Sequence, residues 1–288
     1  MHTNKFPMIA VACLIIFGTA LVCFAQKAGA RRVAQTSDAM RVERDIAYVK
    51  GASDPLNTLD LYAPKTGDNH PVVIHIHGGG FSIGDKVSGA GVKPQAFTGA
   101  GYVFISVNYR LSPAVKFPAH VQDVAKAIAW VQRNVKQYGG DPARLFVMGH
   151  SAGAQLAALV ATDGRYLKAE GLNLKNLSGA VLLDGGTYDI ATAMQTTAQK
   201  VENLTPVFGD DPAVWKQASP LFHVAKGKGI PPFLIIHVAS RQDSGAQSRD
   251  LAKALNDAGV KAEVKPAQNK THATLNKELG QADDAPTA

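Results

Sequence analysis

The sequence predicts an α/β fold with a mostly parallel, doubly wound sheet flanked by helices. Three observations predict it. Short apolar runs alternate with helical patterns along the chain, and these runs are continuously apolar, as in strands that are buried on both faces. The 288 residues, 46% of them hydrophobic, also suffice for one large core. Because parallel strands joined by right-handed crossovers bind ligands at their carboxyl ends, we expect the functional residues there.

The expected elements can be placed in chain order. A turn-rich segment separates two expected strands, 45–49 and 56–62, which predicts an antiparallel hairpin at the start of the sheet. The later strands are expected at 72–76, 103–107, 145–148, 180–183, 233–238 and 262–265, and the helices at 93–100, 119–138, 154–161, 248–256 and 273–279. Residues 187–223 show no clean period between two strands, which predicts a small lid inserted over the site.

The amino-terminal 25 residues differ in kind from the rest. A charge-free run from Phe6 to Ala25 follows Lys5, and small residues stand where a cleavage site needs them. This predicts a secretory signal at 1–25 and a secreted or periplasmic protein. An uncleaved membrane anchor is the alternative, because about 20 apolar residues can span a bilayer. Both cysteines, Cys13 and Cys23, lie in this segment, so a protein cut after Ala25 has neither disulfides nor a thiol nucleophile.

The remainder divides into a loose arm and one domain. Residues 26–40 are polar and without periodicity, which predicts a flexible arm, and 41–288 form the expected catalytic domain. The formal charge is +7, but the Lys and Arg residues are scattered and form no basic stripe interleaved with aromatic residues. Nucleic acid is therefore not an expected partner.

A glycine-flanked serine supplies the expected nucleophile. Ser151 stands in the sequence Gly-His-Ser-Ala-Gly, between an expected strand and an expected apolar helix. Such a turn crowds the backbone, and glycines leave room for it, so the pattern predicts a nucleophile elbow. The alternative is an ordinary strand-to-helix loop in which Ser151 caps the helix.

A serine hydroxyl needs a base, and the base needs a carboxylate to orient it. His272 follows the last expected strand and is the expected base, with His223 in the lid as a weaker alternative. Asp243 is the carboxylate in the loop after strand 233–238 and is the expected acid. Asp184, at the end of the preceding strand, remains open as its rival, and Asp243 could instead cap the helix that follows it.

A second glycine-rich turn, His77-Gly78-Gly79-Gly80, follows strand 72–76. Glycine lets a backbone approach a ligand closely. We expect Gly79 and Gly80, together with Ala152 beside the nucleophile, to donate backbone N–H groups to the oxyanion that forms on the substrate.

The two motifs in this order resemble the α/β-hydrolase superfamily, near its hormone-sensitive-lipase-like and acetyl-esterase branch. The resemblance covers about residues 56–279 and implies hydrolysis of a small carboxylic ester with no metal or organic cofactor. Enzymes of this branch commonly carry Asp where this chain has Ser240, which weakens the assignment of the acid. Many also have a helical amino-terminal cap that is missing here, so we expect an open pocket for short or aryl acyl groups.

Two other functions remain open from the sequence. The Gly-His-Ser-Ala-Gly turn is also similar to that of arylformamidase-like enzymes, although Phe81 after the glycines and the expected signal favour an esterase. A hydrolase fold retained as a binding module is the non-enzymatic alternative. Such modules usually lack the nucleophile or the base, whereas Ser151 and His272 are both present here.

Overall fold

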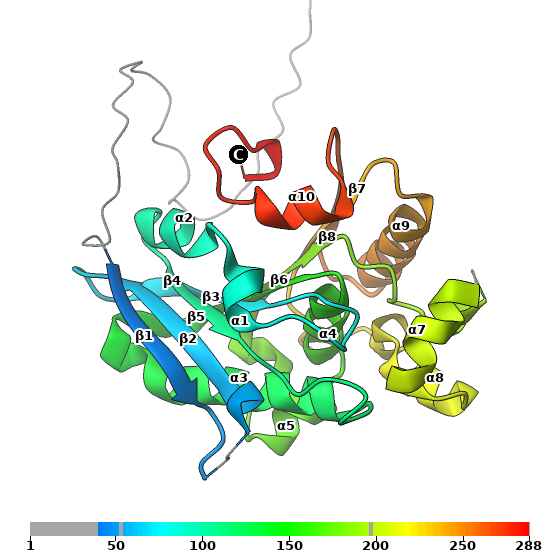
Figure 1. Cartoon of the computed structure of the whole chain (residues 1–288), viewed down its shortest axis with the longest axis horizontal. Helices are drawn as coiled ribbons and strands as arrows, with labels where there is room; N and C mark the ends of the chain where they lie inside the picture. The colour runs from blue at the N-terminus through cyan, green and yellow to red at the C-terminus, as the bar shows by residue number, and fades with distance from the viewer. Residues whose placement is uncertain (1–39, 52–53, 196–197, 288) are drawn as a thin grey trace, which may run out of the picture. The chain divides into compact units, whose positions relative to one another are not determined.

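One sheet of eight strands organises the described part of the chain (Figure 1). The computed structural model describes residues 40–51, 54–195 and 198–287. The strand order is β1-β2-β4-β3-β5-β6-β7-β8; β1 and β2 are antiparallel, β2 is antiparallel to β4, and the other pairs are parallel. The strands are β1 (Met40–Ala47), β2 (Thr58–Pro64), β3 (His70–Ile76), β4 (Val103–Val107), β5 (Gly140–His150), β6 (Leu177–Leu183), β7 (Phe233–Val238) and β8 (Ala262–Ala267). The predicted fold class is confirmed.

The central strands are continuous apolar runs because both of their faces are covered. Ile74 of β3 pairs in register with Ile105 of β4 and with Val147 of β5, and all three side chains are fully buried. The edge strand β1 differs from expectation, since it begins at Met40 rather than near residue 45. Its residues are largely charged and exposed, as suits the edge of a sheet, so no apolar run marks its start in the sequence.

Helices cover both faces of the sheet. The larger hydrophobic core includes side chains of α3 (Ala119–Asn134), α4 (Ala152–Thr162), α5 (Gly164–Ala169) and α9 (Gln242–Asp257). The smaller core, on the other face, is closed by α1 (Lys86–Ala90), α2 (Lys93–Gly99) and α10 (His272–Lys277). Short 3-10 turns lie at Pro55–Asn57, Val135–Tyr138, Leu174–Asn176, Pro220–His223 and Ala285–Thr287.

The segment between β6 and β7 forms a small helical lid, as the sequence predicts. It comprises α6 (Ile190–Met194), α7 (Ala198–Phe208) and α8 (Pro212–Ala218), drawn in yellow-green and yellow in Figure 1. Gln155 of α4 donates from Nε2 to the carbonyl of Ala218 at 2.6 Å. The ring of Phe208 packs edge-on against Phe81, with 5.2 Å between centroids. The lid is therefore fixed both to the helix after Ser151 and to the loop after the glycines.

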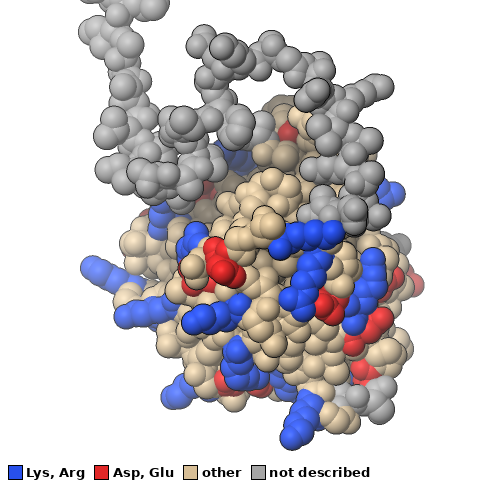
Figure 2. All heavy atoms as spheres, turned by 90° about the vertical axis from the view of Figure 1, so that its left-hand side faces the viewer, with Lys and Arg blue, Asp and Glu red and all other residues tan. Residues whose placement is uncertain are grey.

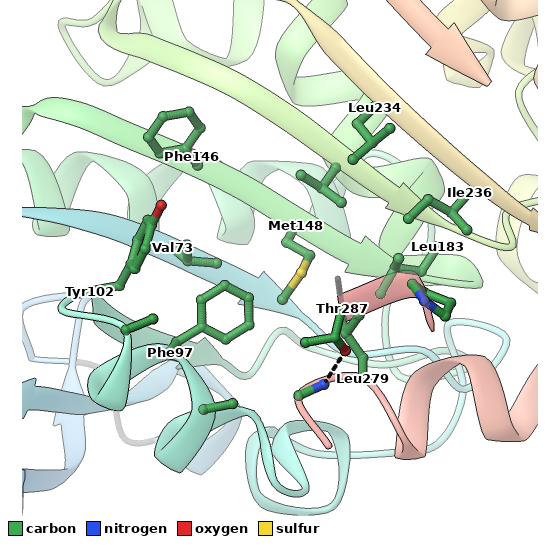
Figure 3. A pocket seen from close by; sticks show the side chains of 15 residues that line it. Val73, Phe97, Tyr102, Phe146, Met148, Leu183, Leu234, Ile236, Leu279 and Thr287 are labelled. Carbon is green, nitrogen blue, oxygen red and sulfur yellow. Dashed lines mark hydrogen bonds between the residues drawn. The ribbon is translucent and has the colours of Figure 1, made fainter. Parts of the chain in front are cut away.

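An apolar pocket of about 350 Å³ lies against the smaller core, between the sheet, α2 and residues 279–287. Figure 3 shows Val73, Met148 and Leu183 on the sheet side, with Phe97 and Leu279 across the cavity from them. This pocket shares no lining residue with the pocket at Ser151 and is lined mainly by hydrocarbon side chains. The apolar pocket against the smaller core is therefore not the site of the chemistry.

The charged side chains are spread over the face seen in Figure 2, where Lys and Arg are interspersed with Asp and Glu. The positive charge is not gathered into one stripe on this face. Within the described ranges, no helix combines the length and the apolar character needed to cross a bilayer. The expected signal 1–25 and most of the expected arm 26–40 lie outside the described residues.

Candidate active site

Ser151 stands at the sharp turn between β5 and α4. Its φ of 56° and ψ of −119° lie in a region that residues with a side chain rarely adopt. Glycines make the turn possible, because a Cβ on Gly149 would collide with the carbonyl of Gly153, and a Cβ on Gly153 would collide with that of Ile76. The Ser151 N–H donates to the carbonyl of Leu183 at 2.9 Å. The strand, turn and helix predicted around Ser151 are therefore present.

His272 reaches Ser151 from the other end of the chain. It is the first residue of α10, directly after the helix-capping Thr271, whose side chain accepts from the Thr274 N–H. The Nε2 atom of His272 lies 3.0 Å from the Oγ of Ser151, within hydrogen-bond reach. The structure thus brings together the predicted nucleophile and the predicted base. His223, the weaker alternative, instead lies with its Nε2 2.8 Å from the carbonyl of Gln217.

The structure corrects the position of the carboxylate. Asp184, not Asp243, faces the histidine, with Oδ2 at 2.6 Å from Nδ1 of His272. Asp184 follows β6 directly, with a φ of 49°. Asp243 lies in the first turn of α9, where its Oδ2 accepts from Nη2 of Arg241 at 3.2 Å. The helix begins at Gln242, one residue before Asp243, so this side chain belongs to the helix and not to a loop beside His272.

Asp184 is buried, and both oxygens of its carboxylate accept hydrogen bonds. Its Oδ1 accepts from the Val238 N–H at 3.0 Å and from Ser244 Oγ at 2.7 Å, while its Oδ2 accepts from Arg241 Nη1 at 2.7 Å as well as facing His272. Burial alone would raise the pKa of Asp184, but the hydrogen bonds, that with His272 first, outweigh it and hold the pKa well below its ordinary value. Asp184 is therefore ionised, and can orient the imidazole through Nδ1–H.

The glycine-rich loop after β3 turns tightly beside Ser151. Gly79 and Gly80 have φ values of 123° and 60°, which favour glycine. The carbonyl of Gly79 accepts from the Ser82 and Ile83 N–H groups, at 3.1 and 3.0 Å, and a Cβ on Gly79 would collide with the carbonyl of Ile83. Gly80 instead has open space where a Cβ would stand. The two glycines thus differ: one is required by packing, the other by its backbone conformation.

A pocket of about 180 Å³ opens at Ser151. Of the three expected oxyanion-hole residues, Gly80 and Ala152 line it and Gly79 does not. Ala152 is the first residue of α4, so its N–H has no partner within the helix. The other lining residues are Phe81, Asp184, Gly186, Thr187, Asn203, Leu204, Arg241 and His272. No group of three or more metal-ligating side chains is found in the described part of the chain.

Two further residues, which the sequence analysis did not assign to the site, contact His272. His150, just before Ser151, points its Nε2 at the carbonyl of His272 at 2.8 Å, and the two rings lie 4.5 Å apart. Burial, helped by the neighbouring His272 ring, lowers the pKa of His150 to about 4, so it is neutral at pH 7 and can donate this hydrogen bond. Arg241, after β7, places Nη1 2.8 Å from Nδ1 of His272. Only its place in the loop expected to carry the acid could have drawn attention to Arg241.

The sheet order, the serine at the β5–α4 turn and the histidine after β8 define the protein as an α/β hydrolase. Within that class, the chain belongs to the BD-FAE family, whose sequence model matches residues 59–255.

Proteins of similar sequence are named as esterases. The chain is 34% identical over 251 residues to "Esterase LipQ" of Mycobacterium tuberculosis, a match that covers 80% of this chain and 55% of that protein. It is 31% identical over 257 residues to "Isoprenylcysteine alpha-carbonyl methylesterase ICME" of Arabidopsis thaliana, covering 82% of this chain and 57% of that protein. The chain thus spans little more than half the length of these relatives.

A solved structure shares the fold. A hyperthermophilic esterase from the archaeon Pyrobaculum calidifontis superposes with a TM-score of 0.68 at 26% identity, covering 82% of this chain and 79% of that one.

Proposed function

We propose that the protein is a serine carboxylic ester hydrolase that works through an acyl-enzyme intermediate. The observation that carries the proposal is the unbroken series from Ser151 Oγ through His272 to the buried Asp184, with Ser151 on the wall of a pocket. A hydroxyl becomes a nucleophile when a positioned base takes its proton, and this series supplies the base and its orienting carboxylate. The names of the similar proteins support the choice of an ester as substrate.

The reaction divides into two steps. Ser151 Oγ attacks the ester carbonyl carbon while Nε2 of His272 takes the hydroxyl proton, and the proton then passes to the leaving alkoxide as the C–O bond breaks. Water next attacks the acyl-enzyme and gives a proton to His272. The histidine returns this proton to Ser151 Oγ as the bond between Oγ and the acyl carbon breaks, and the acid leaves. Asp184 stabilises the imidazolium that forms in each step.

The oxyanion formed in each step needs donors at its own position. Gly80 and Ala152 line the pocket beside Ser151, and their backbone N–H groups are the proposed donors. Gly79 supports them by shaping the turn through its carbonyl, which holds Ser82 and Ile83. Losing one donor of this kind typically slows turnover by about 100-fold or more.

The small pocket supports a short or aryl acyl group as substrate. At about 180 Å³ it is smaller than the roughly 300–1,000 Å³ of sites that hold drug-sized ligands. Leu204 of α7 and Phe81 supply apolar walls, and Thr187 and Asn203 supply polar ones. We expect kcat/KM on p-nitrophenyl esters to be highest for acetate to butyrate; an optimum at long acyl chains would contradict this substrate class.

The decisive experiment is covalent labelling of the nucleophile. A fluorophosphonate probe should attach to Ser151, and Ser151→Ala should abolish both the adduct and ester hydrolysis. Ser178, which lies on the surface at β6, offers a matched control, because Ser178→Ala should retain both. Absence of an adduct on a folded protein would favour the binding module, whereas hydrolysis of aryl formamides but not of esters would favour the arylformamidase.

The amino-terminal segment supports a secreted or periplasmic location. Its charge-free run and small residues before Gln26 match a cleavable signal, and association with a membrane is proposed only if the segment stays uncleaved. Amino-terminal sequencing of the secreted protein should begin near Gln26. Recovery of the intact chain in the membrane fraction would instead indicate an anchor.

A further inference from the structure

Arg241 is in direct contact with both Asp184 and His272, the proposed acid and base of the site. It is the residue before α9, and its Nη1 lies 2.7 Å from Oδ2 of Asp184 and 2.8 Å from Nδ1 of His272. Its Nη2 lies 3.2 Å from Oδ2 of Asp243, and its side chain is 31% exposed on the wall of the pocket. One guanidinium thus joins the buried carboxylate, the imidazole and the more exposed carboxylate.

The hydrogens decide what this contact does. Arginine has five N–H donors and no acceptor. In the reactive tautomer, Nδ1–H of His272 donates to Asp184, which leaves Nε2 free to accept the Ser151 proton. Arg241 Nη1 and His272 Nδ1 are then both donors, so their approach is no hydrogen bond. It places a positive charge beside a ring that must itself become positive.

We propose that Arg241 opposes protonation of His272 and that Asp243 moderates this effect, so that the pair sets the acid limit of the enzyme's pH range. The proposal rests on the esterase function above, because it concerns the same base. Asp184 favours the imidazolium, and Arg241 offsets part of that attraction by sharing the same Oδ2 atom. Asp243, on the far side of the guanidinium, offsets part of the arginine charge.

Groups on the other elements around His272 do not supply this positive charge. His150 of β5 lies against the ring at a tilt, with 4.5 Å between the ring centroids, but it is neutral near pH 7 because burial lowers its pKa to about 4. Lys93 of α2 lies behind α10, where Nζ donates to the carbonyl of Asn276 at 2.6 Å. Lys270, two residues before His272, is paired with Glu278 and Asp284. Among the cations described at this site, Arg241 is the one that reaches the imidazole.

The signs of two variants test the proposal. The dependence of kcat/KM on pH reports the essential base of the free enzyme, and a charge within about 4–6 Å shifts such a titration by about 1–3 units. Because Arg241 is partly exposed, we expect the low end of that range. Arg241→Gln should move the acid limb of kcat/KM upward by about one pH unit, which is a roughly tenfold loss of activity on that limb. Asp243→Asn should move the limb the other way, by less.

Matched variants separate charge from support. Arg241→Lys keeps the positive charge and should leave the limb near its original place. Arg144→Gln removes a surface arginine that pairs with Asp141 at 2.7 Å, and should leave the profile unchanged. Short p-nitrophenyl esters over about pH 5–9 serve as substrates. Thermal melting shows whether each variant is folded, and Asp243→Asn carries the test if Arg241→Gln does not fold.

The outcomes distinguish this proposal from the proposed function. If Arg241→Gln and Asp243→Asn shift the acid limb of kcat/KM in opposite directions, the proposal that Arg241 and Asp243 set this limb is supported. The proposal would be overturned if the acid limbs of kcat/KM for the two variants coincided with that of the original protein, or if both moved in the same direction. Arg241 would then be only a structural support of Asp184. If Ser151→Ala retained full activity, the esterase mechanism itself would be wrong, regardless of the pH profiles of the Arg241 and Asp243 variants.

Discussion

Replacing Asp184 by Asn tests which carboxylate serves the histidine. The Asp184 carboxylate accepts four hydrogen bonds, from Val238 and Ser244 at Oδ1 and from Arg241 and His272 at Oδ2. An asparagine oxygen can keep the first two, but its NH₂ group then faces two donors. The ring of His272 must present Nδ1 as an acceptor and carry its proton on Nε2, where it can no longer take one from a hydroxyl.

The expected magnitude follows from this change of tautomer. A carboxylate-to-amide change in a serine hydrolase triad lowers kcat by about 10⁴-fold, and we expect about 10³- to 10⁴-fold for Asp184→Asn. Loss of the hydrogen bond from Arg241 to a buried charge should also lower the free energy of unfolding, by about 1.5–3 kcal/mol. Asp243→Asn changes a partly exposed side chain that does not contact His272, and it should keep kcat within a few-fold at the pH optimum.

Initial rates on p-nitrophenyl acetate and urea unfolding followed by circular dichroism measure the two effects. Circular dichroism also shows that the compared variants are folded. If folded Asp184→Asn kept more than about a tenth of kcat while Asp243→Asn lost nearly all of it, the assignment of Asp184 would be refuted.

Three further outcomes follow from the same geometry. Gly80→Ala should fold, because a Cβ there meets nothing, yet should cost about 1 kcal/mol of stability at a positive φ and slow turnover; measured kcat and urea midpoints check both. Gly153→Ala should fail to give soluble folded protein in an expression trial, because its Cβ would collide with the backbone of Ile76. Stability should fall as the pH is lowered from about 6.5 to 4, since the unfolded chain protonates His150 while the fold keeps it neutral. His150→Ala should flatten that slope in urea titrations by up to about 1.4 kcal/mol per pH unit, and an unchanged slope would exclude His150 as one of its sources.

The parts of the fold that could be predicted are those that depend on local pattern. The continuous apolar runs of β3, β4 and β7 mark strands that are buried on both faces, and the structure places them within two residues of the expected bounds. The elbow at Ser151 could be predicted for a different reason. A Cβ on Gly149 would collide with the carbonyl of Gly153, four residues away, so this constraint is local and the sequence itself shows it.

The identity of the carboxylate could not be predicted, because it depends on contacts between distant segments. Asp184 and Asp243 both follow a strand, and each stands near the expected edge of the sheet. What separates them is the φ of 49° at Asp184 and the start of α9 at Gln242, which takes Asp243 into a helix. Neither feature leaves a periodic signal. The antiparallel pair at 45–49 and 56–62 was predicted, but the start of β1 at Met40 was not, because its pairing with β2 stabilises a strand whose sequence is polar.

The chain position of the acid matters less than the point in space that it reaches. β6 and β7 are neighbours, with Leu183 in register with Ile236, and neighbouring strands lie only about 4.8 Å apart. The Asp184 N–H donates to the carbonyl of Ile236, so this aspartate stands beside the end of β7 although it follows β6. A carboxylate from either strand can therefore serve one histidine. At the place where the family resemblance led us to expect Asp, this chain has the exposed Ser240, and the neighbouring Arg241 contacts Asp184. In this chain the end of β6 therefore supplies the carboxylate, and the loop after β7 supplies a cation, Arg241, that contacts it.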